Sequence, residues 1–213
     1  MKIHSILLAT FLFPAALPAE EEVYRFEGET ITDEPGKPAQ SQNFIFTLTG
    51  DGDTDNCVWE IKEDSTAPSP KHVLAITKAD AIDTSFPMAL LKGKEKRFQD
   101  CTISVKFKIT KGTVNQAAGI VFRAVDADHC YLARVSALDN SISVLRVNKK
   151  VRQRVATGKV SVPVNRWNAL KITLKGTEMS FFLNDNKVLT AKDDVYPSGK
   201  VGLVTQEIGR AHV

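Results

Sequence analysis

The sequence predicts an all-β protein, built as a sandwich or jelly roll. Residues 101–109 alternate strictly between apolar and polar side chains, as an antiparallel strand with one buried face does. Two more strand patterns follow at residues 116–123 and 129–135, with an aspartate turn at residues 126–128 between them. No long stretch repeats with the 3.6-residue period of a helix. Packed antiparallel sheets with few, short helices are therefore expected.

Other strands are indicated by short apolar or alternating runs between polar turns. Before the block at residues 101–147 we expect strands at residues 23–27, 44–48, 57–61, 73–77 and 86–91. Hairpins and further strands are expected at residues 141–147, 151–157, 167–174, 179–183, 187–190 and 200–204. Dipeptides such as Pro35-Gly36 and Asp139-Asn140 mark the turns. We expect the block at residues 101–147 to form the central sheet.

Length and composition fit one domain and exclude one class of partner. The chain has 213 residues, of which 43% are hydrophobic and 25% charged, so it can form one well-buried core. Its formal net charge is only +3. Nucleic-acid binding depends on concentrated positive charge, so nucleic acid is not expected as the main partner.

The N-terminus has the features of a secretory signal. Lys2 precedes the apolar residues 6–13, and Leu17-Pro-Ala19 supplies a cleavage site before the acidic residues 20–22. The apolar run is too short to cross a bilayer. We therefore expect a signal peptide at residues 1–19, a domain at residues 20–206, no membrane insertion, and a secreted or periplasmic location.

The cysteines leave two possibilities open. Cys57, Cys101 and Cys130 cannot all pair within one chain, and no spacing resembles a zinc or redox motif. Export permits one disulfide, whereas Cys101 and Cys130 lie in strand patterns where a buried free thiol fits as well.

The C-terminal half resembles a known superfamily. Trp167, the strand at residues 170–174, the run Phe181-Phe-Leu-Asn184 and the segment Gly199-Lys-Val-Gly-Leu203 are similar to the last strands of concanavalin A-like lectin/glucanase domains. That resemblance implies a two-sheet antiparallel jelly roll, in which the tryptophan packs in the core and the last glycines allow close strand approach.

Within the superfamily the chain is most similar to secreted bacterial 3-keto-disaccharide hydrolase-like and LamG-like domains. The strand at residues 116–123, the aspartate turn, and a strand with Tyr131 and Arg134 carry this likeness, which extends over about residues 23–206. Residues 207–213 instead resemble the translation of a sequencing adapter. We expect them to be a non-native tail that replaces a final strand, and we expect the sheet edge left there to lie beside the first strand.

Enzymatic chemistry has few candidate residues. Laminarinase-type hydrolases on this fold present two carboxylates from one strand, in the pattern Glu-x-Asp-x-x-Glu. The nearest match, Glu60-Ile-Lys-Glu63, has Lys62 in the aspartate position, so this mechanism is rejected. His129 beside Asp126 and Asp128 is the remaining acid/base or metal candidate, although a solvated turn explains the same residues.

A calcium site is a second possibility. Asp51, Asp53 and Asp55 alternate as in the start of a calcium loop, where side-chain oxygens converge on the ion. Asn56 stands where an EF-hand needs glycine, so the loop is not an EF-hand. A looser calcium site and a plain polar loop both remain open, and no other cofactor is expected.

Two arginines are the main binding candidates. Arg123 and Arg134 each lie in an otherwise apolar strand, and a covered guanidinium must find acceptors. Sugar hydroxyls or a carboxylate would supply them, with Gln116 as a further contact and Tyr131 or Trp59 stacking on a pyranose. The alternative is that both arginines pair with acidic residues within the fold.

A basic hairpin follows the central block. Its positive residues are Lys149, Lys150, Arg152, Arg154 and Lys159. They indicate either a solvated edge that discourages strand pairing or a site for anionic glycans or a cell surface.

The combined prediction is a carbohydrate-binding module whose concave sheet holds a glycan through Gln116, Arg123, Tyr131 and Arg134. Two alternatives remain: hydrolysis or elimination on a 3-keto-disaccharide, and a non-catalytic interaction module of the envelope.

Overall fold

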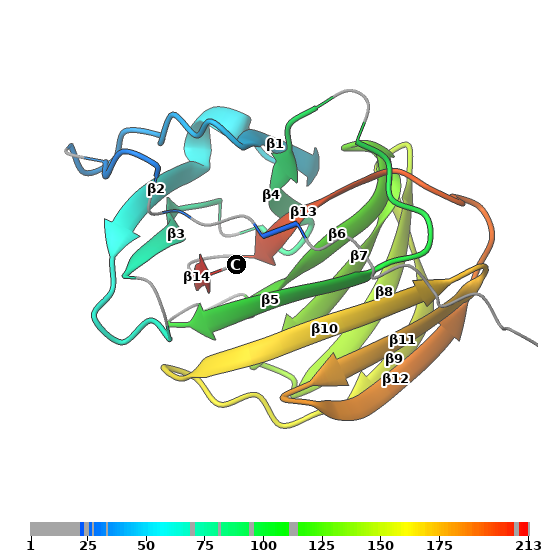
Figure 1. Cartoon of the computed structure of the whole chain (residues 1–213). Helices are drawn as coiled ribbons and strands as arrows, with labels where there is room; N and C mark the ends of the chain where they lie inside the picture. Colours follow the sequence, from blue (N-terminus) through cyan, green and yellow to red (C-terminus); the bar gives the residue numbers. More distant parts are fainter. Residues whose placement is uncertain are drawn as a thin grey trace, which may run out of the picture.

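Two antiparallel seven-stranded sheets face each other across one hydrophobic core (Figure 1). The computed structural model describes residues 22–23, 26, 28–32, 34–68, 71–80, 82–93, 96–110 and 115–206, and the backbone of residues 209–212. The first sheet has the order β1-β4-β13-β6-β7-β8-β9, and the second β12-β11-β10-β5-β14-β3-β2. The predicted two-sheet antiparallel jelly roll is confirmed.

The strands of the first sheet are β1 (Phe44–Gly50), β4 (Ser85–Leu91), β6 (Ala117–Asp126), β7 (His129–Ser136), β8 (Ser141–Asn148), β9 (Val151–Lys159) and β13 (Lys200–Gln206). Those of the second are β2 (Val58–Glu63), β3 (His72–Lys78), β5 (Thr102–Ile109), β10 (Trp167–Lys175), β11 (Glu178–Leu183), β12 (Asn186–Lys192) and β14 (Gly209–His212). Within the described residues the only helical element is the short 3₁₀ turn η1 (Thr54–Asn56).

Every strand predicted between residues 44 and 204 is present, with ends shifted by a few residues. The strand expected at residues 23–27 is not observed, because Val23 and Phe26 lie outside strands and residues 24, 25 and 27 lie outside the described part. The alternating pattern and turn residues were therefore sufficient to locate the strands.

The assignment of residues 101–109 to one central sheet with the arginine strands was wrong. β5 belongs to the second sheet, whereas β6, β7 and β8 are neighbours in the first. The strict alternation in β5 is confirmed, because Val105, Phe107 and Ile109 are buried in the core. An alternating strand fits either sheet equally well, so its pattern could not show which sheet it joins.

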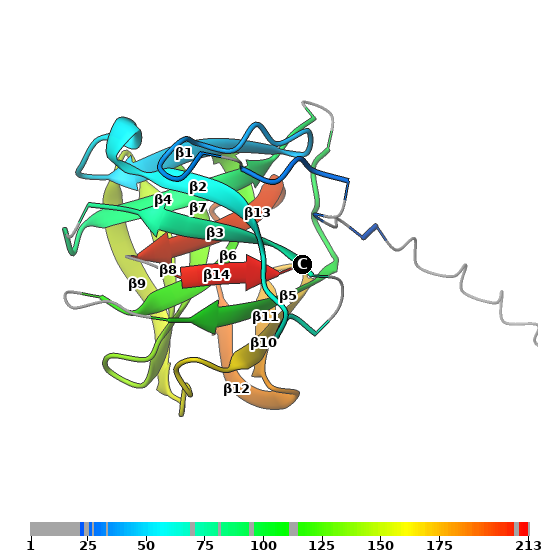
Figure 2. The ribbon, with the colours of Figure 1, turned by 90° about the vertical axis from the view of Figure 1, so that its left-hand side faces the viewer.

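The last strand does not lie at an edge beside the first. β14 pairs with β5 on one side and β3 on the other, inside the second sheet (Figure 2). The interpretation of residues 207–213 as a non-native tail stays a prediction.

The main core fills the space between the sheets. Its largest rings include Phe122, Tyr131 and Phe181, all fully buried, with the Phe122 and Tyr131 rings stacked at 5.3 Å. Each such apolar side chain contributes about 1.5–3 kcal/mol to folding.

The first sheet is rolled so strongly that its two edges meet. In a flat sheet, β4 and β9 would lie five strand spacings apart, about 24 Å. Instead Arg152 of β9 donates to the carbonyl oxygen of Thr84 at 2.9 Å, and its guanidinium lies 4.9 Å from the Phe86 ring of β4. Thr49 of β1 likewise donates to Asp128 at 2.9 Å.

Rolling encloses a second hydrophobic cluster on the outer face of this sheet, the face turned away from the second sheet. Its buried residues are Phe86, Met88, Leu90, Val121, Ala124, Cys130, Leu132, Val147 and Val204. Apolar packing therefore closes one part of the outer face, and Arg134 lies on the same face, two residues beyond Leu132.

Close strand approach depends on glycines, as the resemblance implies. A Cβ on Gly119 would lie 1.8 Å from the carbonyl oxygen of Ala133, and one on Gly202 would lie 2.3 Å from that of Ala89. Neither position accepts a larger residue without moving a strand.

All three cysteines are free thiols. Cys57 and Cys130 are buried and Cys101 is partly so, and burial raises the pKa of Cys130 to about 12. Of the two possibilities left open, the free thiols are the one observed.

The described residues contain no helix long and apolar enough to cross a membrane. The predicted signal peptide, residues 1–19, lies outside them.

Candidate functional site

Four polar residues form a closed ring of hydrogen bonds at the polar end of the first sheet's outer face. Arg134 of β7 donates through Nη2 to Asn115 Oδ1 at 2.8 Å and through Nε to Gln206 Oε1. Asn115 Nδ2 donates to Asp83 Oδ1 at 2.9 Å, and Gln206 Nε2 to the carbonyl oxygen of Asp83 at 2.7 Å. We call this set the Arg134 ring.

Strand alternation puts Arg134 on this face. Tyr131 and Ala133 point into the main core, whereas Leu132 belongs to the outer cluster, so Arg134 follows Leu132 outward. Its neighbour across β6 is Gly119, and its neighbour across β8 is Ser143. The absence of a side chain at Gly119 leaves the space beside the guanidinium open to Gln206 and Asn115.

No carboxylate pairs directly with Arg134 within the described residues. Burial lowers the pKa of Arg134, Asp139 and Asp83 raise it, and the charge of Arg154 lowers it again. The guanidinium remains protonated at any physiological pH. It thus keeps its positive charge while hydrogen-bonded to two neutral carboxamides, and its Nη1 has no partner in the described part of the chain.

Hydroxyl groups and two apolar side chains surround the ring. Ser143, opposite Arg134, shares a 3.1 Å hydrogen bond with Thr157 of β9. Ile82, next to Asp83 in the chain, and Leu138, in the β7–β8 turn, are 41% and 53% exposed. Asn115 and Gln206 are each 3% exposed, so Arg134 and Asp83 are the members of the ring that reach the surface.

Arg123, the other predicted binding arginine, is not available to a ligand. It is 1% exposed and donates through Nη2 to the carbonyl oxygens of Gly176 at 2.6 Å and Gln99 at 3.3 Å, with Asp100 at 3.9 Å. A β-bulge after Phe122 and a φ of 48° turn it from the outer face towards the second sheet. The predicted alternative was pairing with acidic residues across the sheet, whereas Arg123 is held mainly by backbone carbonyl oxygens.

The two aromatic candidates are also buried. Tyr131 is 0% exposed, and its hydroxyl donates to Asp193, which also accepts from Arg146 at 2.7 Å. Trp59 is 2% exposed and stacks on Phe46 with ring centroids 5.8 Å apart. Neither ring can stack on a sugar, and both predictions were wrong because alternation places these residues on the inner faces of their strands.

Gln116, the fourth predicted contact, lies beside Asn115 at the start of β6 and is half-buried. Sequence reasoning missed Asn115, Gln206 and Asp83. Gln206 follows Val204 on the outer face of β13, so alternation gave a signal for it, whereas Asp83 and Asn115 lie in connections whose course no pattern predicted.

The predicted acid/base residues come together at the other end of β7. His129 Nδ1 lies 2.8 Å from Asp126 Oδ1, and Asp128 accepts from Thr49. His129 shares the inner-facing parity of Tyr131 and lies five residues from Arg134, about 17 Å along the strand. One small ligand therefore cannot contact both His129 and Arg134.

The aspartates of the suggested calcium loop do not converge. Asp53 caps η1 by accepting from the Asp55 backbone N–H at 3.0 Å, and Asp51 accepts from Thr84. Within the described residues, no group of three or more His, Cys, Asp or Glu side chains is placed to hold a metal ion. The looser calcium site stays a prediction.

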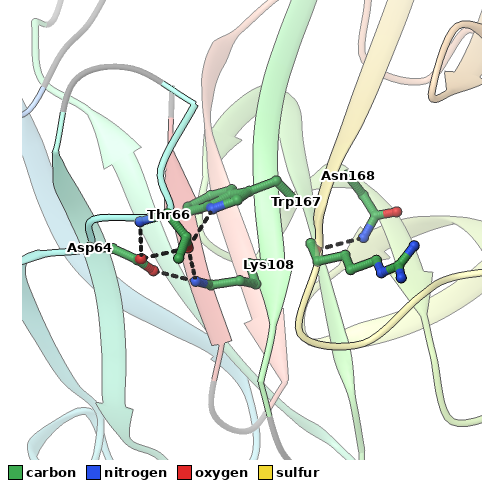
Figure 3. Close-up of polar contacts among 6 residues, drawn as sticks. Asp64, Thr66, Lys108, Trp167 and Asn168 are labelled. Carbon is green, nitrogen blue, oxygen red and sulfur yellow. Dashed lines mark hydrogen bonds and ion pairs between the residues drawn. The ribbon is translucent and has the colours of Figure 1, made fainter.

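A second polar network lies on the outer face of the second sheet (Figure 3). Lys108 of β5 forms an ion pair with Asp64 and donates to Thr66 at 2.7 Å, while Thr66 donates to Asp64 at 2.6 Å. Trp167 Nε1 also donates to Thr66, at 3.2 Å, and its ring lies 5.0 Å from the Lys108 ammonium. Asp64, Thr66, Lys108 and Trp167 are called the Lys108 cluster below.

The cluster corrects one expectation from the resemblance. Trp167 does not pack in the main core, because it faces outward beside Lys108 while Leu170 and Ile172 of the same strand face inward. Lys108 and Asp64 are 8% and 6% exposed and neutralise each other. This cluster attaches the β2–β3 loop to the second sheet and so has a structural role.

Some residues of the basic hairpin have structural contacts, and others are exposed on the surface. Lys149 and Lys150 form the β8–β9 turn with positive φ, and Arg152 closes the rolled sheet. Arg154 is exposed on the outer face and makes no hydrogen bond or ion pair within the described residues.

The two rolled antiparallel sheets define a concanavalin A-like jelly roll. Residues 47–209 match the 3-keto-alpha-glucoside-1,2-lyase-like domain family, and the chain belongs to that family. A levanase from Bacillus subtilis (strain 168) is 29% identical over 105 residues, which are 49% of this chain and 16% of the levanase.

Solved structures agree on the fold. The carbohydrate-binding module CBM66 from Bacillus subtilis has a TM-score of 0.60 at 22% identity, covering 81% of this chain and 94% of that one. A glycoside hydrolase family 16 endo-glucanase from Bacteroides ovatus has a TM-score of 0.52 at 12% identity, covering 79% and 81%. At these identities the likeness shows the fold alone.

Proposed function

We propose that this protein is an exported carbohydrate-binding module that holds its glycan with the Arg134 ring. The observation that carries the proposal is a charged guanidinium fixed by Asn115 and Gln206, with no carboxylate of its own and with Nη1 directed at no described partner. Hydrogen bonds from a charged donor to a neutral acceptor contribute about 1.5–3 kcal/mol each.

The surroundings suit a sugar. Vicinal hydroxyls both donate and accept, so they match a guanidinium donor, Arg134, beside an exposed carboxylate acceptor, Asp83. Asn115 and Gln206, each 3% exposed, orient the guanidinium. The exposed Ile82 and Leu138 supply apolar contact for the C–H faces of a ring. The likeness to CBM66 and the levanase match support the same class of ligand.

Glycan titration by NMR tests the proposal. Arg134→Gln should weaken binding of any glycan that the wild type binds by at least tenfold, about 1.4 kcal/mol. Lys106→Gln is the control, because it removes one exposed charge from the outer face of the second sheet. Equal binding by wild type and Arg134→Gln, with both folded, would move the site elsewhere. No binding to any glycan would favour the envelope interaction module.

A second candidate function is elimination on a 3-keto-glycoside, which the family description and the Asp126–His129 pair favour. Asp126 fixes the imidazole through Nδ1, and Nε2 has no hydrogen-bond partner in the described part. Nε2 would take the C2 proton, which the C3 ketone acidifies, while the C1–O bond breaks and the leaving oxygen gains a proton.

Product signals on incubation with 3-keto-disaccharides would establish this reaction. His129→Asn should then abolish turnover and leave Arg134-dependent binding unchanged. Turnover that persists in His129→Asn would exclude this base.

A further inference from the structure

Arg154 places a second guanidinium near the Arg134 ring on the same outer face. It lies opposite Leu145 of β8, which lies opposite Leu132 of β7, two residues before Arg134. Two strand spacings, about 10 Å, separate the backbones of β7 and β9, and the sheet curls towards the side on which both side chains project.

Two arginines, Arg134 and Arg154, and two aspartates, Asp83 and Asp139, lie near one another at this end of the face. Asp83 and Asp139 are the acidic groups that act on Arg134, and both already accept hydrogen bonds, from Asn115 and Ser141 respectively. Arg154 disfavours the charge on Arg134, as two like charges do when they share a weakly solvated surface.

The two arginines differ in what holds them. Arg134 is fixed by two carboxamides, whereas Arg154 is exposed and makes no hydrogen bond or ion pair with described residues. Fork-shaped guanidinium groups bind carboxylates through paired hydrogen bonds, and a ligand carboxylate would relieve the repulsion between these two.

We propose that the glycan is acidic, with a uronate carboxylate bound by Arg154 and Nη1 of Arg134, and with neutral hydroxyls contacting Arg134 and the exposed Asp83. This inference rests on the proposed carbohydrate-binding function and specifies its ligand class.

Matched ligands isolate the carboxylate. Oligosaccharides of galacturonic, glucuronic and mannuronic acid would be compared with their methyl esters, which keep the sugar and remove the charge, by calorimetric titration of the full chain. At least one acid should bind about tenfold more tightly than its ester. Arg154→Gln should abolish that difference and leave the ester affinity unchanged, whereas Arg134→Gln should weaken both forms. The preference should also shrink as salt is raised.

The outcomes separate the two proposals. Equal affinity for acid and ester, or an equal loss of both in Arg154→Gln, overturns the acidic ligand and leaves carbohydrate binding in place. Absence of binding to these ligands and to neutral glycans overturns both. Lys106→Gln, which removes one positive charge from the opposite sheet, should preserve the acid preference, and its loss there would show an effect of net charge only.

Discussion

The outer faces of the two sheets each carry a basic residue inside an otherwise regular strand, yet the two residues have different surroundings. Lys108 on the second sheet is covered by the β2–β3 loop, which brings Asp64 to it as an ion-pair partner. Arg134 on the first sheet is held by the carboxamides of Asn115 and Gln206. Lys108 has a direct ion-pair partner, whereas Arg134 is oriented by neutral groups and has carboxylates, Asp83 and Asp139, only beyond ion-pair distance within the described residues.

This difference distinguishes a charged side chain that stabilises the fold from one that can bind a ligand. A buried cation that is paired with a carboxylate cannot bind an external anion. Removing its partner leaves an unpaired charge in the protein interior. A cation held by neutral acceptors keeps its attraction for an external group. The predictions below use substitutions on the two faces to test this distinction.

The largest effect is expected in the Lys108 cluster. Asp64→Ala leaves the Lys108 ammonium buried without a counter-charge, and we expect the free energy of unfolding to fall by about 3–5 kcal/mol in denaturant titrations. The double variant Asp64→Ala/Lys108→Met is the control, because it removes both charges and keeps the volume of the lysine stem. It should recover most of the loss. A loss below about 1 kcal/mol in Asp64→Ala would mean that water reaches Lys108, and the comparison would fail.

A smaller effect is expected at Arg123. Arg123→Met keeps the apolar stem but removes the hydrogen bonds to Gly176 and Gln99, which should cost about 2 kcal/mol of unfolding free energy. Glycan affinity should not change, because Arg123 is 1% exposed and faces away from the Arg134 ring. A variant as stable as the wild type that binds more weakly would reverse the roles assigned to the two arginines.

Arg123 and Arg134 show which features of the fold and of the candidate site could be predicted from the sequence. Alternation located the strands, the jelly roll and the outward direction of Arg134, because the period of a strand is a local property. The same alternation predicted Arg123 wrongly, since a β-bulge and a positive φ break the period there. The partners Asp83 and Gln206 are distant in the chain from Arg134, and only the strand order of the first sheet brings them together.

Substitution of Arg134 should affect stability less than substitution of Asp64. Arg134→Gln removes two hydrogen bonds at a partly exposed position, but its neutral carboxamide can pair with the carboxamides of Asn115 or Gln206 and leaves no unpaired charge, so the unfolding free energy should fall by about 1–2 kcal/mol. Thermal unfolding of Arg134→Gln and Asp64→Ala side by side would measure the contrast. If the Arg134 variant lost as much stability as the Asp64 variant, Arg134 would be a structural residue like Lys108.

The smallest effect concerns the charge that Arg134 exerts on its surroundings. Burial disfavours ionisation of Asp139, but the Ser141 hydroxyl and the positive charge of Arg134 outweigh it and hold the pKa of Asp139 below its ordinary value. Asp139 therefore contributes stability that is complete above its unfolded pKa of about 3.9 and is lost as the pH falls through the lower folded pKa.

Carboxyl-detected NMR titration of Asp139 should show a midpoint below the ordinary value in the wild type. Arg134→Gln should raise that midpoint towards the ordinary value, because it removes one of the groups that favour the ionised form. Arg123→Met should leave it unchanged, since that guanidinium lies on the other side of the sheet. An unchanged midpoint in Arg134→Gln would show that solvent screens the Arg134 charge before it reaches Asp139.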